Sequence, residues 1–377
     1  MSLWTESAEP LPRPPLAEFS NEAALSTITS NLHLFKVSTP INVDRFENLL
    51  TIARHPNLPF VHSVPSPIPK TEAERDFIQA QISKEETVGR YSPTFGRDLL
   101  PGMYSMPIHA VPKEGGEYSL NSMIAKEDIA GVTLDNVQDL GEAINEYRRY
   151  HPCDVLQIWK ADVSEAYWHM SMHPLWKIKQ IVTFEGERRV DQANVFGGRA
   201  SQRIFHAFMS LVIWIAVFVR LIQAFIYVDN SFSFAKLGDL SYYVKYRKMF
   251  PSEMVTLLLL WDELGIPHEE YKQIFGSPLP VIGFDVDPNL MRISLKNDSK
   301  LSLVRELCEF ARYKSKQTLR DFEHIAGSLN WALNICPLLR PGLSAVYAKI
   351  KGKSNAKGLL WFNRSVVEEL LWAAYHL

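Results

Sequence analysis

The chain switches repeatedly between helical and strand periodicity, and the order of the switches indicates an α+β fold. Val137, Leu140 and Ile144 recur at helical spacing, so the pattern predicts an amphipathic helix over 134–150. The apolar run over 155–161 is typical of a buried strand. Other stretches follow the same two periods. They predict strands over 102–113, 181–184, 189–195, 281–286 and 291–295, a hairpin over 224–234, and helices over 202–224 and 254–264.

Prolines dominate the first hundred residues and predict little regular structure there. Eleven prolines precede residue 100, and each removes a backbone donor and disfavours a helix. Short helices are expected after Asn42 and from Thr71, where Thr71 and Glu74 have the spacing of a capping box. Beyond Ser299 the periodicity is helical. We therefore expect an N-terminal extension over 1–100, a mixed region over 101–295, and a helical region that begins at 296.

Composition places the chain among ordinary globular proteins. Its 377 residues are 46% hydrophobic and 22% charged, enough for a large core, and this excludes disorder as the main state. The three cysteines lie far apart in sequence, which argues against a disulfide framework or a clustered cysteine zinc site. The first fifteen residues carry acidic side chains and four prolines and do not have the pattern of a secretory signal. An intracellular, reducing location is expected.

Two further stretches bear on partners. The uncharged run over 207–219 is thirteen residues long, whereas a membrane-spanning helix needs about 20 apolar residues, so we expect a buried helix and no membrane partner. The net charge is only −2, yet the segment 291–353 holds twelve Lys and Arg against five Asp and Glu. Such an excess fits a surface that meets polyanions, and a solvated helical face is the alternative.

Two aspartates stand where apolar strands end. Asp162 follows the strand over 155–161, a place that also favours a helix N-cap. Asp229 lies with Asn230 between two apolar arms, where the dipeptide also suits a hairpin turn. The pair is more informative than either residue, because carboxylates from two separate segments are what a two-metal centre requires. The two aspartates are 67 positions apart.

The order of these segments resembles the palm of reverse transcriptases, most closely those of DIRS-like, tyrosine-recombinase retroelements. The resemblance extends from about residue 100 to the C-terminus. It implies a right-hand polymerase with an antiparallel palm sheet, reduced fingers and a helical thumb: fingers and palm over 101–295, thumb over 296–353, and the start of an RNase H-like region over 354–377. Motif A corresponds to 162–167, motif B to 194–205, motif C to 227–230, motif D to 264–273 and motif E to 281–284. The sequence over 321–350 resembles the thumb.

The resemblance implies catalytic roles for matching residues. Asp162 and Asp229 would ligate two Mg²⁺ ions, with Mn²⁺ as an alternative, and the backbone carbonyl of Val163 would be a further ligand. Asn230 stands where the family usually has a second aspartate, which keeps an oxygen ligand and loses a charge. Lys272 would be the motif D acid that protonates pyrophosphate, and a solvated surface lysine is the alternative.

It also implies substrate-binding roles, each with a simpler structural alternative. Tyr167 would exclude a 2′-hydroxyl, or would be a core tyrosine. The glycines of motif B would let the backbone approach template and nucleotide, or would only form a turn. The turn over 282–284 would grip the primer, or would be an ordinary hairpin. The predicted substrate-binding residues are Lys113, Tyr167, Gly197, Gly198, Ser201, Gly283 and Phe284.

The fingers depart most from the family pattern. The strand that ends at Lys113 is followed almost directly by Leu120 and Asn121, so a family hairpin with its triphosphate-binding arginine is deleted. Glu114 and Glu117 would repel phosphate there, and the developing charge would be poorly stabilised. The chain thus resembles a degenerate copy.

The expected function is RNA-directed DNA synthesis on an RNA/DNA primer–template with dNTPs, by a nucleotidyltransferase whose activity Asn230 and the shortened fingers impair. The competing hypothesis is a retroelement-derived nucleic-acid-binding protein that has lost catalysis, a pseudoenzyme, and a third is an inert relic. The retroelement lineage implies a nuclear location.

Overall fold

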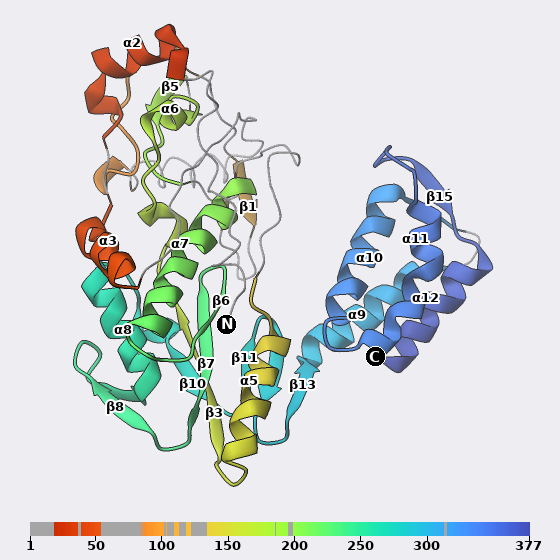
Figure 1. Cartoon of the computed structure of the whole chain (residues 1–377). Coiled ribbons are helices and arrows are strands. Elements are labelled where there is room, and N and C mark those ends of the chain that lie inside the picture. Colours follow the sequence, from red (N-terminus) through yellow and green to blue (C-terminus); the bar gives the residue numbers. More distant parts are fainter. Residues whose placement is uncertain are drawn as a thin grey trace. The chain divides into compact units, whose positions relative to one another are not determined.

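A computed structural model shows two compact units, Met1–Phe275 and Gly276–Leu377 (Figure 1). The boundary falls inside the stretch 101–295 expected to form fingers and palm, and the domain assignment stays a prediction. The structure describes residues 19–36, 39–53, 84, 86–101, 103, 109–112, 118–121, 134–184, 186–194, 199–312 and 315–377.

The first unit is built on a four-stranded sheet of order β10-β3-β7-β6. The central strands β3 (Leu156–Asp162) and β7 (Asn230–Lys236) pair antiparallel over seven residues, from Leu156 opposite Lys236 to Asp162 opposite Asn230. β6 (Phe225–Tyr227) pairs antiparallel with β7 through a tight turn, and β10 (Ile274–Gly276) lies beside β3. This hairpin confirms the expected pairing over 224–234.

Helices cover both faces of this sheet. On one face, Trp159 and Ala161 of β3 pack with α7 (Arg199–Phe218) and α8 (Ser252–Leu264) in the main core. On the other face, α5 (Val137–Tyr150) buries Val137, Leu140 and Ile144, and its Tyr147 ring contacts Phe234 edge-on. Alternate strand residues therefore face opposite helical layers, as the side-chain period of two requires.

Helix α7 contains the apolar run considered above as a membrane segment. Among the described residues, it is the one helix long and apolar enough to cross a membrane, over Ser201–Phe218, and 72% of that stretch is buried within the protein. Met209, Val212 and Ala216 lie in the main core. These observations agree with the expected buried helix.

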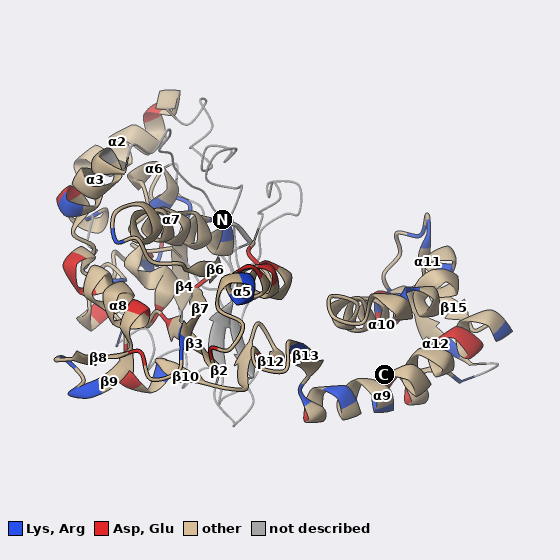
Figure 2. Ribbon diagram, turned by 60° about the horizontal axis from the view of Figure 1, so that its bottom comes forward, with Lys and Arg blue, Asp and Glu red and all other residues tan. Residues whose placement is uncertain are grey.

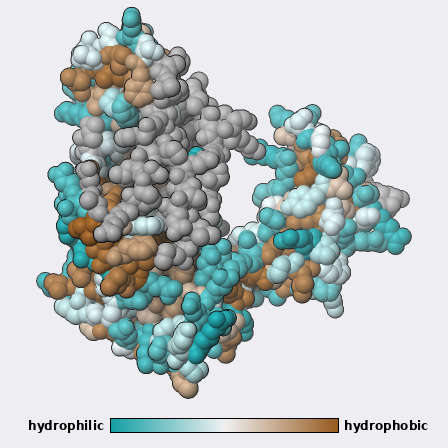
Figure 3. Space-filling view, in the orientation of Figure 1, coloured by the Kyte–Doolittle hydropathy of each residue, from teal (hydrophilic) through white to brown (hydrophobic). Residues whose placement is uncertain are grey.

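Smaller elements complete the first unit. Helix α3 (Val43–Ile52), expected after Asn42, packs against α7 and α8, and Figure 3 shows apolar surface near it, where Val43 and Ile52 are exposed. The remaining elements are α2 (Glu22–Ser30), η2 (Leu32–Leu34), β1 (His109–Pro112), β2 (Tyr118–Asn121), η4 (Ala166–His169), α6 (Pro174–Lys177), β4 (Ile181–Phe184), β5 (Glu187–Val190), β8 (Leu240–Tyr243), β9 (Lys248–Pro251) and η5 (Glu270–Lys272).

The second unit combines a three-stranded meander with a helical bundle. The antiparallel sheet β11-β12-β13 leads into helices that bury Phe322, Leu329 and Leu370. The rings of Phe310, Phe322 and Phe362 contact one another at centroid separations of 4.9–5.1 Å. The elements are β11 (Leu279–Val281), β12 (Phe284–Asp287), β13 (Arg292–Leu295), α9 (Asn297–Phe310), β14 (Lys316–Thr318), α10 (Leu319–Ala332), η6 (Pro337–Leu343), α11 (Ser344–Ile350), β15 (Leu359–Trp361) and α12 (Arg364–His376).

The expected α+β class with an antiparallel sheet is confirmed, and several element boundaries are corrected. The strand expected over 281–286 is broken, because Ile282 and Gly283 adopt positive φ angles of 50° and 83° and form a turn between β11 and β12. The helix expected over 202–224 ends at Phe218, with Leu221 beyond it at a φ of 54°. Beyond Ser299 the chain also contains the short pair β14 and β15, so it is not purely helical. The helix expected from Thr71 lies outside the described residues.

Candidate functional site

The ends of two central strands bring Asp162 and Asp229 together. Asp162 is the last residue of β3 and lies opposite Asn230, the first residue of β7. Asp229 precedes Asn230 in the turn, where Val228 has a φ of 61°. Burial raises the pKa of the Asp162 carboxyl, and the charge of Asp229 raises it further, while Lys272 acts in the opposite direction. The two carboxylates thus influence each other across the strand ends, and their role as metal ligands stays a prediction.

The side chain of Asn230 hydrogen-bonds one of these two aspartates. Its Nδ2 donates to Asp229 Oδ1 at 2.7 Å. Its Oδ1 is buried and has no hydrogen-bond partner among the described residues. An unpaired buried carbonyl oxygen is costly, and among the described residues no donor satisfies this one.

The ammonium of Lys272 also lies in this cluster. Its Nζ donates to Asp162 Oδ1 at 3.2 Å and to the backbone oxygen of Val163 at 3.1 Å. Both side chains are about one quarter exposed, 26% for Lys272 and 23% for Asp162. Lys272 is therefore part of the site and is not a solvated surface lysine.

Gln273 fixes the backbone next to these residues, a contact that the sequence did not reveal. Its Oε1 accepts from Asp162 N at 3.2 Å, and its Nε2 donates to Asp162 O at 3.0 Å and to Glu269 O at 2.9 Å. Ser164 N donates to Pro267 O at 3.0 Å, and Val163 forms a bridge with His268. The segment 267–273 therefore runs beside the end of β3.

A partly buried polar network holds His268 of that segment. His268 Nδ1 lies 2.6 Å from Tyr246 Oη, and its Nε2 lies 3.2 Å from Asp262 Oδ1. Tyr243 donates its hydroxyl to the same carboxylate, and Lys245 Nζ donates to Asp262 Oδ1 at 2.5 Å. Burial lowers the pKa of His268 and favours its neutral form. A network with every member paired holds one geometry, so it positions Lys272 and Gln273.

Tyr167 lies between the cluster and the core. Its ring contacts Phe205 of α7 edge-on at 5.6 Å and packs against the main core. Burial, with a smaller effect of the Asp229 charge, raises the pKa of its hydroxyl to about 12. The ring is packed against the core, and the role in excluding a 2′-hydroxyl stays a prediction.

Comparison with known proteins identifies the fold. No family model matches the chain, and no curated protein matches it. Among solved structures, a foamy viral protease–reverse transcriptase in complex with dsDNA has a TM-score of 0.54 at 15% identity, covering 98% of this chain and 73% of that one. Its dRH form with dsDNA has a TM-score of 0.55 at 16% identity, covering 98% and 63%. The complex with an RNA/DNA hybrid has a TM-score of 0.53 at 15% identity, covering 98% and 47%. The chain has the right-hand polymerase fold.

In a right-hand polymerase the β3–β7 sheet is the palm, and a basic pair lies beside its first aspartate strand. Glu165, at a φ of 49°, accepts from Lys84 Nζ at 3.1 Å and from Arg90. Arg90 also lies over the Trp168 ring at 5.3 Å. Arg90 is the main cause that lowers the pKa of Glu165 to about 2. Arg90 precedes Lys113 in the chain, and no local pattern in the sequence marks it as a partner of Glu165.

Several predicted substrate-binding residues are placed elsewhere or lie outside the described part. Lys113, Gly197 and Gly198 lie outside the described residues. Ser201 is buried at the start of α7, and its backbone oxygen accepts from Asn194 Nδ2 at 3.1 Å. β1 and β2 pair antiparallel around 113–117, with His109 opposite Asn121. This pairing is compatible with the shortened fingers expected from the sequence.

Gly283 and Phe284 belong to the second unit. A Cβ on Gly283 would lie 3.2 Å from the Trp331 ring, and Phe284 stacks on that ring at 4.9 Å with an interplanar angle of 14°. Phe284 is buried. These contacts explain the residues as packing of the turn on α10, and the primer-binding role stays a prediction.

The donor set at the strand ends suits a divalent cation only in part. The described residues contain no cluster of three or more His, Cys, Asp or Glu placed to hold a metal. Asp162, Asp229 and the backbone oxygen of Val163 are hard oxygen donors of the kind Mg²⁺ prefers, and Asn230 Oδ1 is a free one. Lys272 lies on two of these oxygens. The residues therefore fit one cation once the ammonium withdraws.

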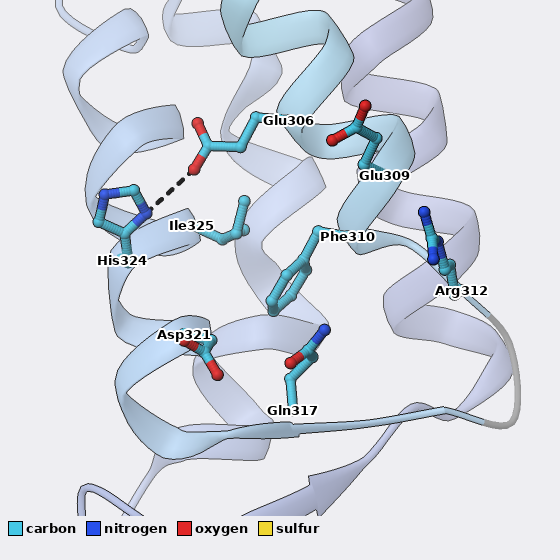
Figure 4. A pocket seen from close by; sticks show the side chains of 8 residues that line it. All are labelled: Glu306, Glu309, Phe310, Arg312, Gln317, Asp321, His324 and Ile325. Atoms are coloured by element: carbon cyan, nitrogen blue, oxygen red, sulfur yellow. Dashed lines mark ion pairs between the residues drawn. The ribbon is translucent and has the colours of Figure 1, made fainter.

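The second unit carries mixed charge on its helices. Figure 2 shows acidic and basic residues interleaved along α9. A cavity of about 370 Å³ at α9 and α10 is lined by Glu306, Glu309 and Asp321, with His324 Nδ1 3.0 Å from Glu306 Oε1 (Figure 4). That cavity suits a polyanion poorly. Basic side chains of this unit lie on its helices as well, at Lys300 and Arg305 of α9, and at Lys349, Lys351 and Lys353 at the end of α11 and just beyond it.

Proposed function

We propose that this protein is a reverse transcriptase-like nucleotidyltransferase of retroelement origin, of the DIRS-like lineage, that carries out RNA-directed DNA synthesis at low rate. The observation that carries the proposal is the juxtaposition of Asp162 and Asp229 at neighbouring strand ends of a polymerase palm. The similar foamy viral proteins are in complex with dsDNA or an RNA/DNA hybrid, which supports a primer–template as the partner here.

The proposed site uses Asp162, Asp229 and Val163 O to hold Mg²⁺ or Mn²⁺. When bound, such ions activate the primer 3′-hydroxyl and stabilise charge on pyrophosphate. The chain's own residues do the rest: Gln273 fixes the Asp162 backbone, Tyr167 limits the space at the sugar, and Arg90 with Lys84 places positive charge beside motif A.

We further propose that catalysis is impaired. Asn230 removes one negative charge from the cluster, and its amide hydrogen-bonds Asp229. The connection between β1 and β2, residues 113–117, is shorter than the family pattern and holds no arginine, and positive charge at the transferring phosphates supplies a large part of the rate in such reactions. Restoring the hairpin should therefore raise activity more than Asn230→Asp.

Primer extension on poly(rA)/oligo(dT) with Mg²⁺ or Mn²⁺ tests the proposal. We expect slow incorporation of dTTP that Asp162→Ala abolishes, a loss of at least about 100-fold. Ser210→Ala, a change in the buried part of α7 where the hydroxyl lies 3.3 Å from His206 Nε2, serves as a control and should retain the rate. Extension that survives Asp162→Ala would refute the assignment of this site.

A second function is a nucleic-acid-binding protein without catalysis. Two observations favour it: Asn230 in place of the second aspartate and the Lys272 ammonium on Asp162. It predicts no incorporation together with salt-dependent duplex binding, since phosphate contacts release counterions. The thumb assignment, the RNase H-like region over 354–377 and a nuclear location stay proposals that derive from the same lineage.

A further inference from the structure

Lys272 contacts the same two oxygens that would bind a divalent cation. Its Nζ lies 3.2 Å from Asp162 Oδ1 and 3.1 Å from Val163 O. An ammonium and a divalent cation cannot both sit on these oxygens, because like charges at such a separation repel strongly in a partly buried site.

The position of this ammonium is built into the backbone. Gln273, the next residue, bonds both backbone groups of Asp162 and also Glu269 O. His268 pairs with Val163 and is held by Tyr246 and Asp262. The segment that carries Lys272 is therefore tied to β3 on both sides of the lysine, and only its side chain is free to swing.

Each carboxylate of the pair already receives a donor from the chain itself. Lys272 donates to Asp162, and the Asn230 amide donates to Asp229. Both donors stabilise carboxylate oxygens that a bound cation would otherwise stabilise. The cluster therefore holds two carboxylates and one ammonium, a smaller net charge than the two aspartates alone would present.

We propose that Lys272 is a resident cation of this site, which competes directly with a divalent ion for Asp162 Oδ1 and Val163 O and thereby sets the metal affinity of the palm. The inference rests on the proposed function only for the identity of the ligand oxygens. It needs no polymerase activity. Divalent cations then bind when the lysine side chain withdraws.

Charge removal alone also tightens cation binding, so the test needs a matched control. Lys160 lies on β3, and its charge lowers the pKa of the Asp162 carboxyl more weakly than the charge of Lys272 does. Lys160→Met removes the same charge as Lys272→Met without freeing Asp162 Oδ1 or Val163 O. Lys160→Met thus reports the effect of removing a nearby charge, and Lys272→Arg reports the effect of a retained charge on the two oxygens. Together the two controls separate direct competition from charge removal.

The experiment is a Mn²⁺ titration of the full chain, followed by the electron paramagnetic resonance signal of free Mn²⁺, without nucleic acid or nucleotide. We expect Lys272→Met to lower the Kd at least about tenfold and Lys160→Met to lower it by about threefold or less. Lys272→Arg, which keeps the charge, should stay within about threefold of the wild type. Adding Asp162→Asn to Lys272→Met should remove the gain.

Equal tightening by Lys272→Met and Lys160→Met would overturn the proposal, as would no tightening or a gain that survives Asp162→Asn. Circular dichroism and thermal melting check that each variant folds, and Lys272→Gln replaces the methionine variant if that one does not. Primer extension by the same proteins is read separately. No extension in any variant would refute the polymerase proposal and leave the Mn²⁺ result standing.

Discussion

At the scale of single residues, Glu253 shows how burial sets a pH dependence. It lies in the first turn of α8, and burial, followed by the charge of Asp239, raises its pKa from 4.5 to about 7. The folded state therefore keeps a proton that the unfolded chain releases, so this group's stabilising contribution is complete below pH 4.5 and is lost as the pH rises through 7. Glu253→Gln removes the buried charge and should raise Tm at pH 8 by about 3–6 °C, or about 1–2 kcal/mol. Thermal melts at pH 8 and pH 5 check this, and an equal shift at both would contradict it.

At the scale of elements, the end of α8 depends on a glycine. Gly265 caps the helix at a φ of 71°, and a Cβ there would lie 2.2 Å from the backbone oxygen of Pro40. Gly265→Ala should therefore destabilise the protein by more than about 2 kcal/mol. Gly141, inside α5, has nothing within 4 Å of its Cβ position, so Gly141→Ala should stabilise by about 0.5–1 kcal/mol. Urea unfolding measures both changes, and a neutral Gly265→Ala would show that the chain around residue 40 moves aside.

At the scale of the whole molecule, two units with separate cores predict separate responses to mutation. Phe322 lies in the aromatic trio of the second unit, and Leu257 lies in the main core of the first. Phe322→Ala should cost about 3–5 kcal/mol within Gly276–Leu377. Hydrogen exchange should accelerate mainly in that unit, whereas Leu257→Ala should accelerate it mainly in Met1–Phe275. Uniform acceleration along the chain in both variants would mean that the units unfold together.

The periodicity of the sequence predicted the elements of the palm because caps, apolar runs and turns are each formed by residues close together in the chain. The Asn136 capping box starts α5, and the apolar run over 155–161 gives β3. Val228 and Asp229 form the turn between β6 and β7, one residue before the expected Asp-Asn turn. The strand expected over 281–286 was wrong where two positive φ angles interrupt it at Ile282 and Gly283. Isoleucine at positive φ carries no sequence signal, since most such positions are glycine or asparagine.

The sequence by itself determined the main helices and strands of the palm, the burial of the long apolar helix, and the two strand-end aspartates, because these depend on residues near one another in the chain. Only the tertiary structure decided which side chains meet those aspartates. Lys272 reaches Asp162 across 110 positions, and Arg90 reaches Glu165 across 75. Such pairings are set by how the sheet and its flanking segments pack in three dimensions. A lysine's long side chain has no local pattern that reveals whether it ends in solvent or on a carboxylate.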